Sequence, residues 1–425
     1  MQRRRDQERQ IGGQQRMTAN RRIGLWLIGA KGGVATTTIL GLLAMQKGLL
    51  GTTGLVTELP QFQDLDLARW DEFVVGGHEI RTAPLGQEAM RVATEMRAVR
   101  PEIVTRCAEE LDEIDRRIRP GTIQNVGPTI AGLADPLVPR ERSPREIVDR
   151  LRADLDEFRR TSGVEHVVAV NVASTEPPVR PAGLPATWAE MEQAMARGSA
   201  SPSAVGELPA SSLYAIAALD LGCSYINFTP SLGAALPALD ELARLRGARY
   251  CGCDGKTGET LLKSVLAPMF AQRNLQVMSW VSHNIFGNLD GRVLNDPANK
   301  KSKIASKDHL LHEILGYRPQ SHVSIEFIES LGDWKTAWDH VHFAGFLGTP
   351  MTLQFIWQGC DSVLAAPLVL DLVRLTDRAR RRGQTGLLRF LASFFKSPLG
   401  VAEHRFDRQF QMLEAWAEEI RGIRD

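Results

Sequence analysis

The chain has 425 residues, more than one compact core normally holds, so we expect two domains or one domain with a large insertion. Apolar residues make up 43% and charged residues 24%, which is typical of soluble globular proteins, and no apolar run is long enough to span a membrane. The net charge of +1 argues against a protein dedicated to binding nucleic acid.

Residues 1–16 are polar and lack the apolar segment of a signal peptide. We predict that residues 1–20 form a disordered extension, with Met17 as an alternative start. The five cysteines are scattered along the chain, which fits a reducing cytoplasm better than a disulfide framework. Cys251 and Cys253 lack the second Cys or His pair of a metal site, so we interpret them as the end of a strand.

A strand predicted at residues 24–28 runs into a glycine-rich loop, followed by an apolar helix at 39–46. Strand, glycine loop and helix form a unit that binds phosphate through backbone N–H groups and a helix N-terminus. The match to the dinucleotide pattern G-x-G-x-x-G is degenerate, so a purely structural turn stays open. The predicted cofactor contacts in this loop are Gly29, Gly32, Gly33 and Thr36.

The same loop, residues 31–38, also resembles the deviant P-loop of partition-type nucleotide-switch ATPases. That loop needs a lysine where this chain has Thr36, and without it the charge of the β- and γ-phosphates is not neutralised. We therefore favour dinucleotide binding over the ATPase.

Residues 54–57 are predicted to form the second strand, which would present Glu58 to a ribose hydroxyl. Residues 73–75 are predicted to form another strand, with a glycine-loosened tip at 76–79. Residues 88–160 are charged, helical in period and interrupted by prolines, which predicts solvated helices.

Two further buried strands are predicted at residues 166–171 and 223–227. Polar side chains follow each of them, and ligands bind at this carboxyl edge in open α/β sheets. Asn171, Ser174 and Thr229 are therefore candidate cofactor contacts.

The second half carries a short stretch, residues 284–291 and 300–307, that is rich in asparagine, glycine and lysine. Its amides and Asp290 can hydrogen-bond hydroxyl groups, and Lys303 and Lys307 would share one face of a helix. Paired ammonium groups suit a phosphorylated or enolate-forming substrate, although composition alone favours a polar loop before a solvated helix.

Upstream of that stretch, residues 250–264 predict a strand, a polar turn and a helix. Asp254 lies at the tip of the strand. Thr257 and Gly258 would offer a hydroxyl and N–H groups at the helix start, which suits a phosphate.

Six motifs in the same order make this half of the chain similar to the myo-inositol-phosphate synthase family. The first three match at Asp254, Thr257, Gly258 and Thr260; at Ser282, Asn284, Gly287, Asn288, Asp290 and Gly291; and at Ser302, Lys303, Ser306 and Lys307. The others match at Gly332, Asp333 and Lys335; at Asp361, Ser362, Leu364, Ala365 and Pro367; and at Lys396 and Pro398.

The resemblance implies an α/β fold with a Rossmann-like NAD-binding domain, residues 21–261 and 359–425, and an inserted α+β catalytic and oligomerisation domain, residues 262–358. It implies NAD as cofactor, a small sugar phosphate as substrate and a homotetramer, without nucleic-acid or membrane partners. The requirement for a divalent metal or a monovalent cation stays open.

The chain departs from the family pattern in its cofactor half. Val34 and Ala35 stand where asparagines would contact the pyrophosphate, so their backbone N–H groups must serve. Glu79 replaces an aspartate and is expected to accept hydrogen bonds in its place. Asp254 is expected to contact the cofactor as well as the substrate.

The implied reaction converts D-glucose 6-phosphate to 1D-myo-inositol 3-phosphate by oxidation at C5, enolisation, aldol closure and re-reduction with bound NAD. We assign Lys303 to proton transfer at C5 and Lys307, Lys335 and Lys396 to the phosphate and developing oxyanions. Asp361 would relay a proton to a lysine, and Asp290 would fix hydroxyls or a cation. The substrate contacts expected are Asp254, Thr257, Gly258, Asn284 and Asn288.

The lysines outside the motifs, Lys256, Lys263, Lys300 and Lys301, are interpreted as surface charge. An NAD-dependent sugar-phosphate dehydrogenase on a similar fold is the alternative enzyme.

Overall fold

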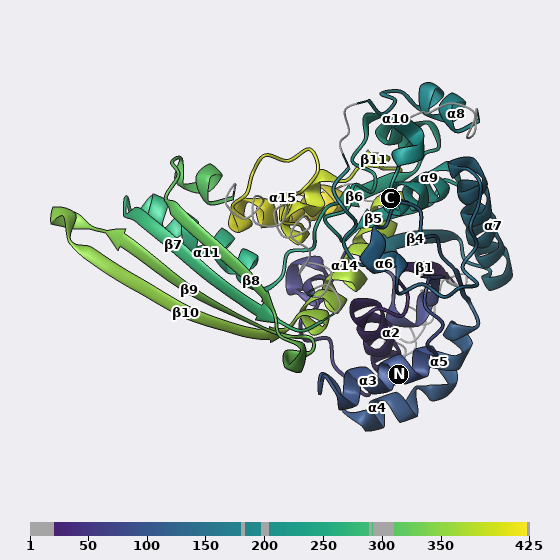
Figure 1. The fold of residues 1–425 in the computed structure, drawn as a ribbon, viewed down its shortest axis with the longest axis horizontal. Helices are drawn as coiled ribbons and strands as arrows, with labels where there is room; N and C mark the ends of the chain where they lie inside the picture. The colour runs from purple at the N-terminus through teal and green to yellow at the C-terminus, as the bar shows by residue number, and fades with distance from the viewer. Residues whose placement is uncertain (1–20, 180–182, 197–203, 289–290, 292–309, 423–425) are drawn as a thin grey trace, which may run out of the picture.

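The computed structural model describes residues 21–179, 183–196, 204–288, 291 and 310–422. Figure 1 shows a layered body built on one β-sheet and a second sheet that projects from its side. The seven strands of the first sheet are all parallel, and in spatial order they are β3 (Ile118–Pro120), β2 (Phe73–Glu79), β1 (Ile23–Ile28), β4 (His166–Asn171), β5 (Ser224–Asn227), β6 (Arg249–Gly252) and β11 (Gly386–Leu387). The strand order reverses between β1 and β4, as in Rossmann-like sheets, so the predicted fold class is confirmed.

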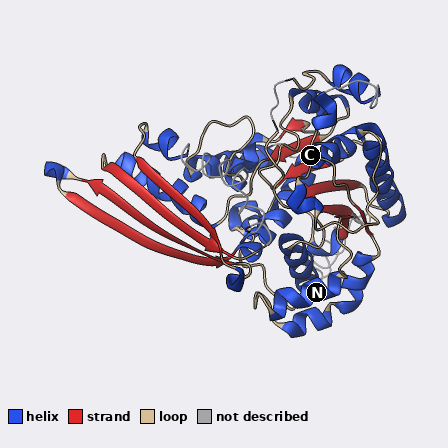
Figure 2. Cartoon of the chain, in the orientation of Figure 1, coloured by secondary structure: helices blue, strands red, loops and turns tan. Residues whose placement is uncertain are grey.

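Helices cover both faces of this sheet (Figure 2). In β1, Leu25 and Leu27 pack into one core cluster and Trp26 and Ile28 into the other, as alternation along a strand requires. One face carries α2 (Gly33–Gln46) and α14 (Asp361–Arg381), and the other carries α7 (Pro144–Ser162), α9 (Ala210–Asp220) and α10 (Pro237–Leu245). Strands buried on both faces read as continuous apolar runs, which is why the sequence predicted β1, β4 and β5 correctly.

Shorter elements connect the layers and extend to the end of the chain. The α-helices among them are α3 (Leu85–Thr94), α4 (Pro101–Arg106), α5 (Ala108–Asp115), α6 (Pro128–Ala131), α8 (Trp188–Ala196) and α15 (Phe406–Gly422). The 3₁₀ helices are η1 (Val56–Glu58), η2 (Pro60–Phe62), η3 (Trp70–Glu72), η5 (Ala204–Glu207) and η8 (Arg389–Phe394).

The second sheet has the strand order β10 (Pro350–Cys360), β9 (Trp334–Ala344), β7 (Gln276–Phe286) and β8 (Gln320–Phe327), with η6 (Glu329–Leu331) and η7 (Phe346–Gly348) in its connections. Helix α11 (Gly258–Gln272) and the helix at 310–315 cover one face, where Phe270 packs near Trp280. The opposite face, called the open face below, carries side chains such as His283 and Ile356, which are exposed. The strands of the first sheet lie at residues 23–252 and 386–387, those of the second sheet lie at residues 276–360, and the domain boundaries remain our proposal.

The strand predicted at residues 54–57 is wrong. A carboxylate replaces a sheet partner there: Asp371 of α14, fully buried, accepts hydrogen bonds from the backbone N–H groups of Val56 (2.7 Å) and Thr57 (3.0 Å). The segment therefore forms η1 instead of a strand. Glu58 pairs with Arg374 at 2.6 Å and does not lie in the cavity described below.

Two other strands also differ from the sequence prediction. Strand β2 continues through the two glycines at residues 76 and 77. Gly77 lets it approach β1 closely, because a Cβ there would lie 2.3 Å from the carbonyl oxygen of Leu27. Strand β3 was missed, since a three-residue strand containing Arg119 and Pro120 has no apolar pattern. After α14, the short strand β11 is followed directly by η8.

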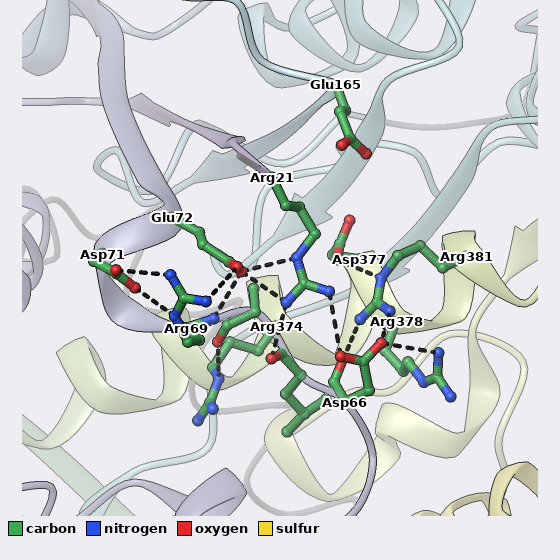
Figure 3. Close-up of polar contacts among 12 residues, drawn as sticks. Arg21, Asp66, Arg69, Asp71, Glu72, Glu165, Arg374, Asp377, Arg378 and Arg381 are labelled. Carbon is green, nitrogen blue, oxygen red and sulfur yellow. Dashed lines mark hydrogen bonds and ion pairs between the residues drawn. The ribbon is translucent and has the colours of Figure 1, made fainter. Parts of the chain in front are cut away.

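An ion-pair network fastens α14 to the segments that precede β1 and β2 (Figure 3). Asp66 contacts three arginines: Arg21 at 3.6 Å, Arg378 at 3.7 Å, and Arg381. Arg21 also pairs with the buried Glu72 at 2.7 Å. The network thus lies at the amino ends of these strands and leaves their carboxyl ends open for a ligand.

Among the described residues, no helix is long and apolar enough to cross a membrane. All five cysteines are free thiols.

Candidate functional site

A cavity of about 390 Å³ lies at the carboxyl edge of the seven-stranded sheet, where the second sheet meets it. Its wall combines the glycine loop after β1, the ends of β4 and β5, and residues of β7 and β9. The predicted site residues that line it are Gly29, Gly32, Gly33, Val34, Glu79, Asn171, Ser174, Thr229, Asp254, Thr257, Asn288, Lys335, Asp361 and Lys396.

Some predicted residues do not line this cavity. Ala35 and Thr36 are fully buried in the first turn of α2, and Asn284, a residue of β7, is also fully buried. Gly258 is the first residue of α11 and follows the lining residue Thr257 in the sequence, but it does not line the cavity itself. The remaining three predictions, Asp290, Lys303 and Lys307, lie outside the described residues, as do Lys300 and Lys301.

The glycine loop lets a ligand approach the protein backbone closely. Gly29 has φ +81°, and a Cβ there would lie 2.8 Å from the Cα of Ala173 on the neighbouring loop. Helix α2 begins at Gly33, and no side chain caps its N-terminus. The N–H groups of a helix start that no side chain caps fit the pyrophosphate of a dinucleotide.

We expect Gly29→Ala to weaken NAD⁺ binding at least about tenfold, because a non-glycine residue at positive φ costs about 1–2 kcal/mol and the clash with Ala173 shifts the loop. Calorimetric titration with NAD⁺ measures the effect. Gly41→Ala is the matched control, since a Cβ at Gly41 of α2 meets nothing within 4 Å. Equal affinities in the two variants would remove the loop from the cofactor site.

Lys31, the lysine that suggested a P-loop, is turned away from the cavity. Its Nζ lies 2.8 Å from Asp115 of α5, and its side chain is 9% exposed. The loop therefore presents no ammonium group to a nucleotide phosphate, because Lys31 points away and position 36 is a threonine.

Glu79 ends β2, where Rossmann-like proteins hold the ribose. Its Oε1 accepts the N–H groups of Ile80 (2.8 Å) and Arg81 (3.1 Å), and its Oε2 accepts that of Lys31 (2.8 Å). Three backbone donors already occupy the carboxylate, so it fixes the glycine loop against β2. Little capacity is left for two ribose hydroxyls.

The ends of β4 and β5 are joined by amide and hydroxyl groups. The Nδ2 of Asn171 lies 3.3 Å from both the Oδ1 of Asn227 and the Oγ1 of Thr229. Thr229 in turn donates its hydroxyl to Asn227 at 2.8 Å. Asn227 was not among the predicted contacts, although its position at the end of a strand could have indicated it.

Glu176 is a second residue that sequence reasoning did not select. It is buried, lines the cavity and accepts the N–H of Ser211 at 2.8 Å, so it caps the first turn of α9. Burial raises the pKa of the Glu176 carboxyl to about 7, against the lowering effect of the hydrogen bonds from Ser211.

Two lysine–carboxylate pairs stand on the other side of the cavity. The Nζ of Lys396 lies 2.9 Å from the Oδ1 of Asp254. The Nζ of Lys335 lies 3.9 Å from the Oδ2 of Asp361 and 5.2 Å from the ring centre of Phe286. Both lysines are partly exposed to the cavity, so their ammonium groups can meet an anionic ligand.

Asp333 organises this side of the site. It accepts the amide N–H of Asn288 at 2.9 Å through Oδ1 and the backbone N–H of Ser362 at 2.8 Å through Oδ2. It thereby joins the loop after β7 to the start of α14. The sequence motif contained Asp333, but its role depends on partners that are distant along the chain.

The surface interpretation of two lysines is wrong. Lys256 is 3% and Lys263 is 1% exposed. The Nζ of Lys263 lies 2.7 Å from Glu259 and 3.9 Å from Asp339, both fully buried, while the Nζ of Lys256 bonds the side-chain oxygen of Gln409. Glu259 lies one helical turn before Lys263, but Asp339 and Gln409 come from β9 and α15, so the sequence around the two lysines could not reveal these partners.

In the part of the chain that the structure describes, no three His, Cys, Asp or Glu side chains are grouped so that they could hold a metal ion.

Comparison with known proteins agrees with this geometry. A family model described as myo-inositol-1-phosphate synthase matches residues 23–418. This chain belongs to the myo-inositol-1-phosphate synthase family. The family model is one of NAD-binding proteins, so the resemblance and the cofactor predicted from the sequence are confirmed. We therefore set aside the partition-type ATPase.

Members of the family with curated names include inositol-3-phosphate synthase 1 of Bacteroides thetaiotaomicron, which is 31% identical over 408 residues, 91% of this chain and 92% of its own length. The rat inositol-3-phosphate synthase 1 is 31% identical over 288 residues, and the chain spans about half the length of that relative (63% of this chain, 50% of the rat protein).

Solved structures show the same fold. A myo-inositol-1-phosphate synthase-related protein from Thermotoga maritima is 25% identical with a TM-score of 0.74, covering 93% of this chain and 98% of its own. Inositol-3-phosphate synthase of Caenorhabditis elegans is 24% identical with a TM-score of 0.82, covering 94% and 86%; this likeness concerns the fold alone.

Proposed function

We propose that this protein is an inositol-3-phosphate synthase that converts D-glucose 6-phosphate to 1D-myo-inositol 3-phosphate. The observation that carries the proposal is the meeting, in one cavity, of a dinucleotide-type glycine loop with the pairs Lys396–Asp254 and Lys335–Asp361. The names of its relatives in the family support the same reaction.

The cofactor would lie along the carboxyl edge of the sheet. We propose that Gly29, Gly32, Gly33 and Val34 hold the pyrophosphate against the start of α2, and that Asn171, Ser174 and Thr229 continue the contact toward the substrate. When bound, NAD⁺ takes a hydride from the sugar and gives it back, so the net reaction is an isomerisation.

The lysines would act on the sugar phosphate. We propose that Lys335 and Lys396 hold the phosphate and stabilise the oxyanions that form during enolisation and ring closure. Asp361, whose Oδ2 lies 3.9 Å from the Nζ of Lys335, would exchange a proton with it. Thr257, at the start of α11, would offer the phosphate the N-terminus of that helix. Proton transfer at C5 by Lys303, with Lys307 and Asp290 in support, remains part of the proposal.

Incubation with D-glucose 6-phosphate and NAD⁺ tests this function. We expect inositol phosphate to form while NADH does not accumulate, because the hydride returns to the substrate. A sugar-phosphate dehydrogenase would instead release NADH in step with turnover, and that result would replace the synthase proposal.

We further propose that the protein is a cytoplasmic homotetramer that assembles through the open face of the second sheet. The five free cysteines support a reducing compartment. Ile356 is 70% exposed on the open face, and the ring of Trp338 there stacks on His283. An exposed isoleucine beside a partly exposed tryptophan on this face of the sheet suits a protein–protein interface.

We expect light scattering to give four times the mass of one chain, and Ile356→Glu to reduce that mass, because a carboxylate would be buried at the interface. Leu245→Glu is the control: Leu245 is 63% exposed at the end of α10, on the other sheet's helix layer. Equal masses for both variants would exclude the open face as the interface.

A further inference from the structure

Lys256 lies within the segment that forms the substrate side of the cavity, yet its side chain is buried. Its neighbours Asp254 and Thr257 line the cavity. Its backbone N–H donates to the carbonyl oxygen of Phe394 at 2.8 Å, and the backbone N–H of Lys396 donates to that of Asp254 at 2.6 Å. Two short segments are thus held side by side: one brings Lys396 to the cavity, and the other carries Lys256 behind the cavity wall.

The amino group of Lys256 meets α15 instead of solvent. It donates to the Oε1 of Gln409, which is fully buried, and lies 5.8 Å from the ring centre of Phe406. Gln409 is fixed in turn, because its Nε2 donates to the carbonyl oxygen of Glu403 at 2.5 Å. In the described part of the chain, Lys256 has no carboxylate within ion-pair distance.

The charged groups that act on Lys256 come from two directions. Lys396, after η8, opposes its positive charge, and Glu403, before α15, favours it. Asp254, on the same turn as Lys256, is already paired with Lys396, and α15 itself presents only an amide and an aromatic ring. Burial first, and the charge of Lys396 second, lower the pKa of Lys256 to about 7.

We propose that Lys256 is a positioning residue that takes up a proton when the phosphate group of the substrate binds at Lys396. The inference rests on the proposed function, because it needs an anion at that lysine. A bound dianion cancels the repulsion between the two ammonium groups, so the charged form of Lys256 becomes favourable. Charged Lys256 then holds the Asp254–Lys396 turn against α15 through Gln409.

Linkage gives the sign of the pH effect. If binding takes up a proton, affinity falls as the pH rises above the pKa of free Lys256. We expect the affinity for D-glucose 6-phosphate, added without NAD⁺ so that no turnover occurs, to weaken several-fold between about pH 7 and pH 8.5. The phosphate stays a dianion across this range, because its second pKa is about 6.

Calorimetric titration in two buffers of different ionisation enthalpy measures the proton directly. With D-glucose 6-phosphate at about pH 7.5, we expect the wild type to take up about half a proton or more. Lys256→Met should abolish the uptake. Gln409→Glu should abolish it too, because the new carboxylate keeps Lys256 charged before the anion binds. Lys47→Met, at a lysine paired with Glu110 at the end of α2, should leave it unchanged.

The outcomes separate this inference from the proposed function. Binding with unchanged proton uptake in Lys256→Met would overturn the role of Lys256 and leave the synthase proposal intact. Absence of binding by both D-glucose 6-phosphate and inorganic phosphate would overturn the anion site at Lys396 itself, and the inference with it.

Discussion

Replacing Lys396 with alanine is expected to lower the rate of inositol phosphate formation by about 10²–10³-fold or more. Lys396 pairs with Asp254 at 2.9 Å on the cavity wall, so its loss removes a cation from the developing oxyanions. It also leaves the carboxylate of Asp254 to repel the substrate phosphate. Product formation is measured by chromatography at saturating D-glucose 6-phosphate and NAD⁺.

Binding of NAD⁺ should survive in this variant, because the glycine loop is formed by other segments. Lys47→Ala, at a lysine that does not line the cavity, is the control and should retain full activity. A Lys396→Ala protein that binds NAD⁺ and keeps activity near the wild-type level would show that Lys396 does not stabilise the developing oxyanions.

Replacing Lys263 with methionine is expected to lower the free energy of unfolding by about 3–5 kcal/mol. Lys263 is the cation between two fully buried carboxylates, Glu259 and Asp339. Burial, and then the charge of Glu259, raise the pKa of Asp339, which shows how poorly the site holds negative charge. Without Lys263 the two acids would have to be protonated or the site would have to open.

Urea unfolding at one fixed protein concentration measures this loss. Adding Glu259→Gln and Asp339→Asn to Lys263→Met should recover most of it, since the charges are then removed together. Arg145→Met breaks a pair with the same spacing, Arg145 and Asp149, on the exposed face of α7, and should change stability by less than about 0.5 kcal/mol. A loss in Lys263→Met as small as that would mean that the buried acids do not depend on this lysine.

Local sequence patterns predicted the elements whose partners are close or whose surroundings are uniform. The buried strands of the parallel sheet and the glycine loop after Ile28 are of this kind, since an apolar run and a glycine pattern suffice to define them. The lining of the cavity by Asp254, Lys335, Asp361 and Lys396 was anticipated from motif resemblance, because no short-range pattern brings these residues together.

The predictions that failed depended on distant side chains. The strand expected at residues 54–57 gave way to a 3₁₀ turn, because Asp371 supplies the acceptors that a neighbouring strand would have supplied. Lys256 and Lys263 resembled surface lysines until Gln409 and Asp339 were brought to them from elements remote in the chain. Asp339 and Gln409 lie outside any short window of sequence around these lysines, although Glu259 is only one helical turn from Lys263.

The hairpin of β9 and β10 places Lys335 at its root, opposite Gly359, while its far end carries Phe346 and Leu347, 89% and 85% exposed. Lys335 occupies the same face of β9 as the buried Asp339. Insertions at the far turn can therefore lengthen the hairpin by whole pairs without moving the lysine. A single residue inserted beside Lys335, however, would rotate it to the opposite face of the sheet. We therefore expect insertions at the tip of this hairpin to leave the position of Lys335 unchanged and a single-residue insertion at its root to displace that lysine from the cavity.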